Sequence, residues 1–76
     1  MKDLLSFLIN KITNSSEFEI SETEEEGRVI YNVKSDPSII GLIIGKSGRT
    51  IKNIRKILSV RAVLEGKSVA VSVEEK

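Results

Sequence analysis

The feature that most constrains this chain is a pair of glycines, Gly45 and Gly48, between an apolar run and an amphipathic one. Glycine has no Cβ, so a pair three residues apart allows a sharp turn and a close backbone approach. A helix is predicted directly after Gly48, and the first amides of a helix have no partner within it. Together with Lys46 and Arg49, these amides would attract an anion such as a phosphate.

Three interpretations of this segment compete. A Walker A phosphate loop needs four residues between its first glycine and Gly-Lys-Ser, whereas only the apolar residues 42–44 separate Gly41 from Gly45. A membrane span needs about 20 apolar residues, and the run before Gly45 is far shorter. The third interpretation is a Gly-x-x-Gly loop between two helices that clamps the backbone of a nucleic acid.

The periodicity of the whole chain predicts its elements. Segments with apolar residues three or four apart predict helices, and alternating segments predict strands. Asp36-Pro37 marks a helix start, since it joins a capping residue to a proline at the first helical position. The expected elements are a helix over 1–14, strands over 17–23 and 28–34 joined by a turn at 24–27, a helix over 37–44, a helix from the glycine loop through 64, and a strand over 68–74.

This order predicts an α+β fold, α-β-β-α-α-β, in which three helices cover one face of a three-stranded sheet. One domain would occupy residues 1–76. Tyr31 is expected in the core and not as a platform for a base, and Gly41, at a cost of about 1 kcal/mol in a helix, suggests close packing or an approaching ligand. The residues expected to point inward from the last helix are Ile51, Ile54, Ile57 and Leu58.

The charges are segregated along the chain, although the net charge is only +1. Residues 17–26 hold six glutamates and no basic residue, while residues 39–64 hold six basic residues and no acid. Such a distribution would attract a polyanion to one side of the molecule and repel it from the other. The basic set begins at the glycine loop, which strengthens the interpretation of that loop as an anion site.

Other functions find less support in the composition. The chain has no cysteine and no histidine, which argues against a disulfide framework, a zinc site and the commonest catalytic bases and nucleophiles. We therefore expect neither an enzyme nor a bound metal or cofactor. The first residues lack the charge and cleavage pattern of a signal peptide, so a cytoplasmic protein without membrane contact is expected.

The run from Ile43 to Ile51, continued in its apolar spacing by Ile54 and Leu58, closely resembles the core of the KH domain. The order of the predicted elements resembles the prokaryotic, type II KH arrangement, so the resemblance covers essentially the whole chain. Among such domains, the chain is similar to the small bacterial single-KH RNA-binding proteins. Leu42 departs from the family, which usually has a basic or polar residue at its position.

The resemblance implies that the Gly-x-x-Gly loop clamps a short segment of single-stranded RNA; single-stranded DNA stays open as a ligand. It further implies an RNA chaperone or post-transcriptional regulator, linked to cell-wall biogenesis and cell shape. The expected partner is a second copy of the chain or a larger KH protein that also carries a Jag domain.

The expected mechanism uses three sets of groups. Amides of residues 46–49 would bind phosphates, basic side chains would follow the backbone, and two isoleucines would line a narrow groove for the bases. The RNA-binding residues expected on this basis are Gly45, Lys46, Ser47, Gly48, Arg49, Lys52, Arg55, Ile40, Ile44 and Lys34. A second hypothesis is a protein-interaction module, in which the apolar helix over 39–44, with Leu42, forms a dimer contact and the glycine loop is only a turn.

Overall fold

The computed structural model describes all 76 residues and contains seven elements of secondary structure. Their order confirms the predicted α+β, type II KH arrangement. The elements are α1 (Lys2–Thr13), β1 (Phe18–Glu25), β2 (Arg28–Ser35), α2 (Pro37–Ile44), the single 3-10 turn η1 (Lys46–Gly48), α3 (Arg49–Leu64) and β3 (Ser68–Glu75).

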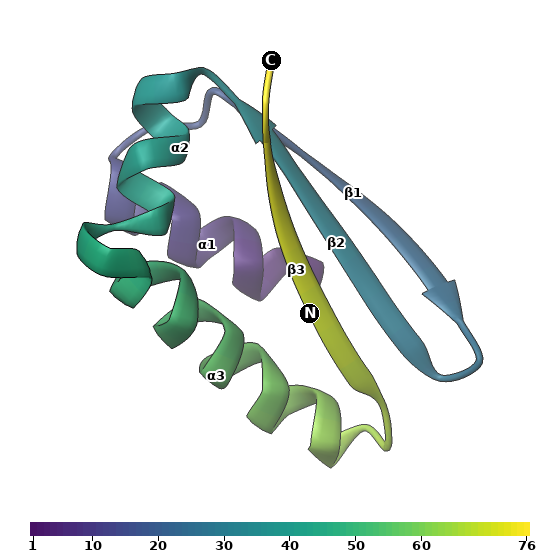
Figure 1. Ribbon diagram of the computed structural model, residues 1–76. Helices are drawn as coiled ribbons and strands as arrows, with labels where there is room; N and C mark the ends of the chain where they lie inside the picture. The colour runs from purple at the N-terminus through teal and green to yellow at the C-terminus, as the bar shows by residue number, and fades with distance from the viewer.

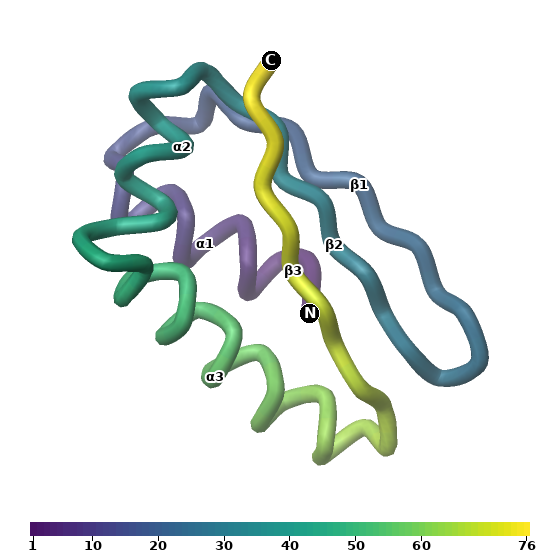
Figure 2. The backbone as a smooth tube through the Cα atoms, viewed as in Figure 1, coloured from purple at the N-terminus to yellow at the C-terminus, as the bar shows by residue number.

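The three strands form one sheet in the order β1-β2-β3. β1 and β2 are an antiparallel hairpin, whereas β3 lies parallel to β2 after the crossover through α2 and α3. All three helices lie on one side of the sheet, and α2 meets α3 at the glycine loop (Figure 1). The backbone path in Figure 2 brings β3 alongside β2 and leaves its other edge facing α2 and α3.

The hairpin turn is tighter than the sequence predicts. Glu26 and Gly27 both have positive φ angles, 48° and 80°, and they alone connect the two strands. A two-residue turn of this kind matches the right-handed twist of the strands. β1 therefore continues through Glu25, where a turn beginning at residue 24 was expected.

A core of eleven buried side chains lies between the sheet and the helices. Tyr31 belongs to it, with only 1% of its surface exposed, so it is not available as a stacking platform. The expectation for Ile57 was wrong, since it is 45% exposed. On α3 the inward positions repeat as Ile51, Ile54, Leu58 and Ala62, and Ile57 lies one position before that row. The core residues are Leu5, Ile9, Val29, Tyr31, Val33, Ile40, Ile43, Ile51, Ile54, Leu58 and Val71.

Candidate nucleic-acid interface

The loop between α2 and α3 holds three residues with positive φ angles, Gly45, Ser47 and Gly48. Gly45 has φ 75° and ψ 177°, a conformation that is essentially restricted to glycine. A Cβ on Gly45 would overlap the Thr50 hydroxyl and lie 2.6 Å from Thr50 Cβ. Gly48 is left-handed with φ 72°, but a Cβ there would meet nothing within 4 Å. Gly45 is thus required by both conformation and space, and Gly48 by conformation alone.

Between the glycines, Ser47 adopts left-handed angles, with φ 57° and ψ 26°. A residue with a Cβ pays about 1–2 kcal/mol for this conformation, and such strain concentrates at ligand-binding sites. Lys46 and Ser47 are both exposed at the tip of the loop. The strained tip is accessible to a ligand.

Two of the four backbone amides predicted to bind phosphate are engaged within the loop. The N–H of Gly48 donates to the carbonyl of Gly45 at 3.2 Å, and the N–H of Arg49 donates to the carbonyl of Lys46. The amides of Lys46 and Ser47, at the tip, are the remaining candidates for a phosphate.

The basic side chains beyond the loop are free of acidic partners. The molecule has four salt bridges, and their cations are Lys34, Arg61, Lys67 and Lys76. None of these cations lies between residues 46 and 56. Arg49, Lys52 and Lys56 are three and four residues apart, so they share one face of α3. Because their charges are not neutralised by the protein, they are available to a polyanion. The unpaired cations of this region are Lys46, Arg49, Lys52, Arg55 and Lys56.

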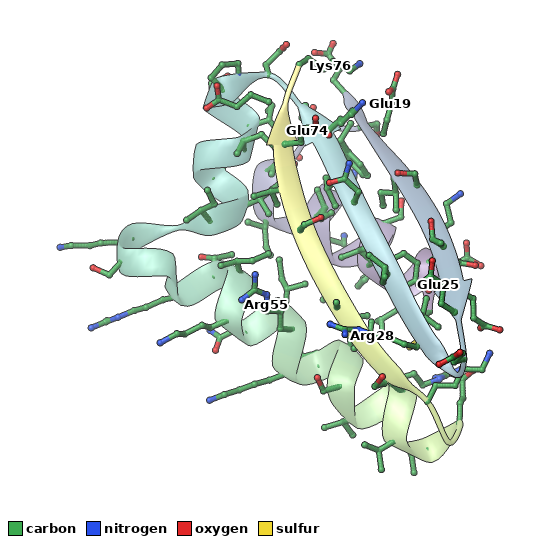
Figure 3. All side chains as sticks on the ribbon, turned by 45° about the vertical axis from the view of Figure 1, so that its right-hand side comes forward. Glu19, Glu25, Arg28, Arg55, Glu74 and Lys76 are labelled. Carbon is green, nitrogen blue, oxygen red and sulfur yellow. The ribbon has the colours of Figure 1, made fainter.

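Arg55 differs from the other cations in the direction of its side chain. Its Nη2 donates to the carbonyl oxygen of Val71 on β3 at 3.1 Å. Figure 3 shows the side chain extending from α3 toward that strand. Arg55 therefore spans the space between α3 and the edge of the sheet. The sequence alone had instead predicted that it follows the RNA backbone together with Lys52.

Lys34 does not join the other predicted site residues. It lies on the sheet face opposite the helices, because its neighbours Val33 and Ser35 are buried beneath them. Its Nζ is 3.7 Å from Glu74. Hydrogen bonding from Asn32, reinforced by the Lys34 charge, holds the pKa of Glu74 below its usual range.

That open face of the sheet is polar, and two of its cations, Lys34 and Lys76, are paired with carboxylates. Lys76 lies 3.2 Å from Glu19 at one end, where Glu74 is also found, while Glu25 and Arg28 mark the hairpin end (Figure 3). A face on which two cations are already matched with carboxylates attracts a phosphate backbone less than a set of unpaired cations does.

The two isoleucines predicted to line a groove have different environments. Ile40 is only 4% exposed and belongs to the core, so its side chain offers almost no surface to a base. Ile44 is half-buried beside the loop and packs against that core. Leu42 is 51% exposed on α2. Gly41 has open space within 4 Å, so close packing does not explain this glycine.

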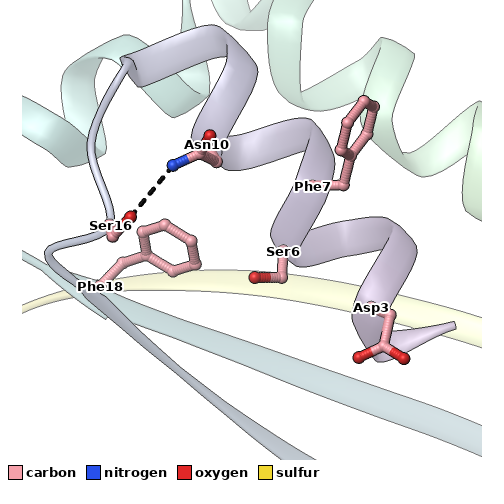
Figure 4. A pocket seen from close by; sticks show the side chains of 6 residues that line it. All are labelled: Asp3, Ser6, Phe7, Asn10, Ser16 and Phe18. Atoms are coloured by element: carbon pink, nitrogen blue, oxygen red, sulfur yellow. Dashed lines mark hydrogen bonds between the residues drawn. The ribbon is translucent and has the colours of Figure 1, made fainter.

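A hollow of about 430 Å³ lies between α1 and the start of β1. Asn10 donates to the Ser16 hydroxyl at 3.1 Å across it, and Phe7 and Phe18 lie at its sides (Figure 4). No loop residue lines it, and Asp3 on its wall would repel a phosphate. No cluster of metal-ligating side chains is present, and no helix combines the length and apolarity that a membrane span requires.

The sequence analysis missed an apolar surface on the second half of α3. Ile57, Val60 and Leu64 are 45%, 65% and 79% exposed and recur at intervals of three and four, so they lie along one side of the helix. Val63 lies beside them and is also exposed. The signal was available in the sequence, because the apolar residues of this segment are too numerous for a single inward face.

Comparison with known proteins identifies the chain along nearly its full length. The model of the family described as "KhpA/KhpB, KH domain" matches residues 2–73. A protein of Chlamydia caviae is 40% identical over 97% of this chain and 94% of its own length, and one of Clostridium acetobutylicum is 35% identical over 96% and 99%. A third, from Thermotoga maritima, is 37% identical over 78% and 80%. Each of the three is described as "RNA-binding protein KhpA".

Proposed function

The chain belongs to the KhpA/KhpB KH-domain family, a family of RNA-binding proteins and not of enzymes, and on this basis we propose that its Gly-x-x-Gly loop clamps a short segment of single-stranded RNA. One observation carries the proposal. The strained, exposed loop is the origin of a group of cations that no acidic side chain of the protein neutralises.

The phosphates bind first at the tip of the loop. The amides of Lys46 and Ser47 and the Lys46 ammonium group receive one phosphate, because this tip projects from the protein. Arg49 and Lys52 continue the track along α3, which rises about 1.5 Å per residue. A KH loop engages about four nucleotides, and the unpaired cations are numerous enough for such a segment.

The bases lie between α2 and α3 on one side and the edge of β3 on the other. Ile44, half-buried next to the loop, supplies an apolar contact, and Ile40 supports this surface from the core. Stacking contributes little, because Tyr31 is buried and neither phenylalanine is near the loop sequence. The groove reads bases by their edges.

In the cell, we propose that the protein acts in the cytoplasm as an RNA chaperone or post-transcriptional regulator. A single groove holds few nucleotides, so a second module raises the affinity through effective concentration. That module is a second copy of the chain or a larger Jag-type KH protein. Roles in cell-wall biogenesis and cell shape belong to the same proposal.

The exposed apolar side of α3 favours dimerisation as a second function. Val60 and Leu64 present large apolar surfaces to solvent in a single chain, and contiguous exposed apolar surface marks interaction sites. On α2, by contrast, only Leu42 is an exposed large apolar residue. We therefore propose the dimer contact on α3 and not on the helix over 39–44.

Charge variants on opposite faces test the RNA-binding proposal. In fluorescence anisotropy with a labelled single-stranded RNA, Lys52→Ala should weaken binding and lower the slope of log K against log salt by about 1. Lys34→Ala removes the same charge from the open face of the sheet and should leave both quantities unchanged. Equal effects of the two variants would contradict the proposed site.

A further inference from the structure

The outer edge of β1 carries an inference about a protein partner. β1 is the terminal strand of the sheet and pairs only with β2, and Figure 1 shows no other element along its outer side. Edge strands are commonly protected by shortness, bulges, proline, charge or a covering element. β1 has eight residues, no proline and an unbroken one-to-one register with β2. Its glutamates are its main protection, and they deter acidic strands without deterring basic ones.

The free backbone groups of this edge follow from the hydrogen bonds of the neighbouring strands. The N–H of Lys76 donates to the carbonyl of Ser35 at 3.0 Å, so the odd-numbered residues of β2 bond toward β3. Because the bonding direction alternates along a strand, the even-numbered residues of β2 bond to their partners, the odd-numbered residues of β1. No backbone hydrogen bond outside the helices and the sheet involves the remaining residues of β1. The residues whose N–H and C=O groups point outward are Phe18, Ile20, Glu22 and Glu24.

The hollow between α1 and the start of β1 adjoins this edge (Figure 4). The side chains of Phe18 and Ile20 lie on the helix side of the sheet, so a strand added to β1 places alternate side chains beside them, at the hollow. Asp3 in its wall forms no salt bridge. The Phe7 ring already has the Lys11 ammonium group 5.5 Å from its centre, so the Phe18 ring is the one left for an incoming side chain. A lysine or arginine fits, since its apolar stem packs on the ring and its charge reaches the carboxylate.

Charge decides which kind of strand this edge accepts. Of the six glutamates between residues 17 and 26, only Glu19 and Glu24 are in salt bridges. A phosphate backbone would be repelled. A second copy of β1 would place glutamates opposite glutamates, which destabilises a pair of strands, whereas opposite charges across two strands stabilise it. A basic segment is therefore the occupant that the edge favours.

We propose that the edge of β1 and the adjoining hollow bind an extended basic segment of a partner protein by strand addition. The outward N–H and C=O groups of β1 supply the pairing, and the side-chain positions supply the selectivity, as in other cases of strand addition. One lysine or arginine of the segment enters the hollow at Asp3. β1 and β3 are opposite edges of the sheet, so the segment leaves the glycine loop free for RNA. The inference goes beyond the RNA-binding proposal and does not depend on it.

Hydrogen exchange measured by NMR at low salt tests the inference, with an acetylated octapeptide of alternating threonine and lysine as the probe. In the native protein alone, the amides of Phe18, Ile20, Glu22 and Glu24 should exchange rapidly. Saturating peptide should slow them by about tenfold or more. The odd-numbered amides of β1, already bonded to β2, should be slow in both samples and serve as an internal control. A peptide with glutamate in place of lysine should change nothing.

Variants separate the contribution of the hollow from that of the strand edge. Asp3→Asn should weaken binding of the lysine peptide about threefold to fivefold, while Glu75→Gln removes the same charge from β3 and should have little effect. Glu22→Pro removes one outward N–H without a bond to β2, and it should prevent protection of the neighbouring outward amides. Circular dichroism checks the fold, and the exchange measurement on the native protein remains decisive if the proline variant does not fold.

Four results would overturn the inference, and none of them bears on RNA binding by the glycine loop. The first is a native protein that does not bind the lysine peptide at low salt. The second is binding that leaves the outward amides of β1 unprotected, which would be charge attraction without strand addition. The third is equal weakening by Asp3→Asn and Glu75→Gln. The fourth is protection of the same amides in concentrated protein without peptide, which would show that a second copy occupies the edge.

Discussion

Gly45 and Gly48 are equivalent in the sequence motif but not in the structure. Gly45 combines a glycine-only backbone conformation with a Cβ position that Thr50 occupies, whereas the Cβ position at Gly48 is open. Gly48→Ala should therefore cost about 1–2 kcal/mol in the free energy of unfolding, the penalty of a left-handed residue. Gly45→Ala should cost more, because the overlap with Thr50 adds to a strain of about 1–3 kcal/mol. Urea denaturation of both variants measures the difference, and equal losses would contradict the asymmetry.

Tyr31 provides a pH prediction at a second single residue. Burial raises the pKa of its phenol well above the ordinary value of 10.0. In the unfolded chain the phenol ionises near that ordinary value, so the unfolded state releases the proton first. The stability that Tyr31 contributes is therefore complete below about pH 10 and is lost as the pH rises above it.

Tyrosinate absorbance gives a direct measurement, because Tyr31 is the only tyrosine and the chain has no tryptophan. The native protein should show no tyrosinate at pH values where a denatured sample is fully ionised. Alkaline ionisation of the native protein should coincide with loss of the circular dichroism signal. A normal titration in the folded state would show that the phenol reaches solvent.

α3 carries two different surfaces along its length. Its first half carries the cations near the loop, while Val60 and Leu64 expose apolar surface in its second half. The double variant Val60→Ser/Leu64→Ser should convert a dimer into a monomer in sedimentation velocity. Phe7→Ser removes exposed apolar area from α1 and should leave the association unchanged. A native protein that is monomeric at high micromolar concentration would contradict the dimer.

The same α3 variant distinguishes RNA binding by one groove from RNA binding by the two grooves of a dimer. Dimerisation presents two grooves, so RNA long enough to reach both should bind the native protein more tightly through effective concentration. Val60→Ser/Leu64→Ser should lose about 10²-fold in affinity for a long RNA and little for a short one. Equal losses on both RNAs would indicate that the serines disturb the groove itself.

The elements were predictable from the sequence where local chemistry alone determines them. Asp36-Pro37 begins α2 as expected, and the glycine loop ends it. The end of β1 was not predictable in this way, because Glu24 and Glu25 are poor strand formers. The tight turn at Glu26-Gly27 and the pairing with β2 keep these two residues extended.

The motif of the candidate site was predictable from the sequence, but the directions of its side chains were not. The sequence places Arg55 three residues after Lys52, on the same side of the helix, and only the tertiary structure reveals that its side chain meets the Val71 carbonyl. Lys34 follows the strand alternation to the face without helices, which a prediction based on charge alone overlooks. Ile57 was assigned inward because apolar type does not distinguish a core face from an interaction face.

For the molecule as a whole, charge segregation becomes a difference between two surfaces. The glycine loop and the first half of α3 hold unpaired cations, whereas the acidic strand β1 lies at the far edge of the sheet from β3. This separation should orient RNA on approach. For about four phosphates, log K should fall with log salt at a slope of about −3; a slope near zero would point to binding without phosphate contacts.

The loop itself is tested most directly by the double variant Lys46→Asp/Ser47→Asp, compared with the native protein in RNA-binding anisotropy at two salt concentrations. Both residues are exposed at the loop tip, and aspartate tolerates the left-handed conformation at position 47, so the fold should persist by circular dichroism. Lys11→Asp/Ser16→Asp places the same change of charge at the end of α1 as a control. If the loop clamps RNA, the loop variant loses salt-sensitive binding and the control retains it. If the folded loop variant binds RNA as tightly as the native protein, the Gly-x-x-Gly clamp is wrong.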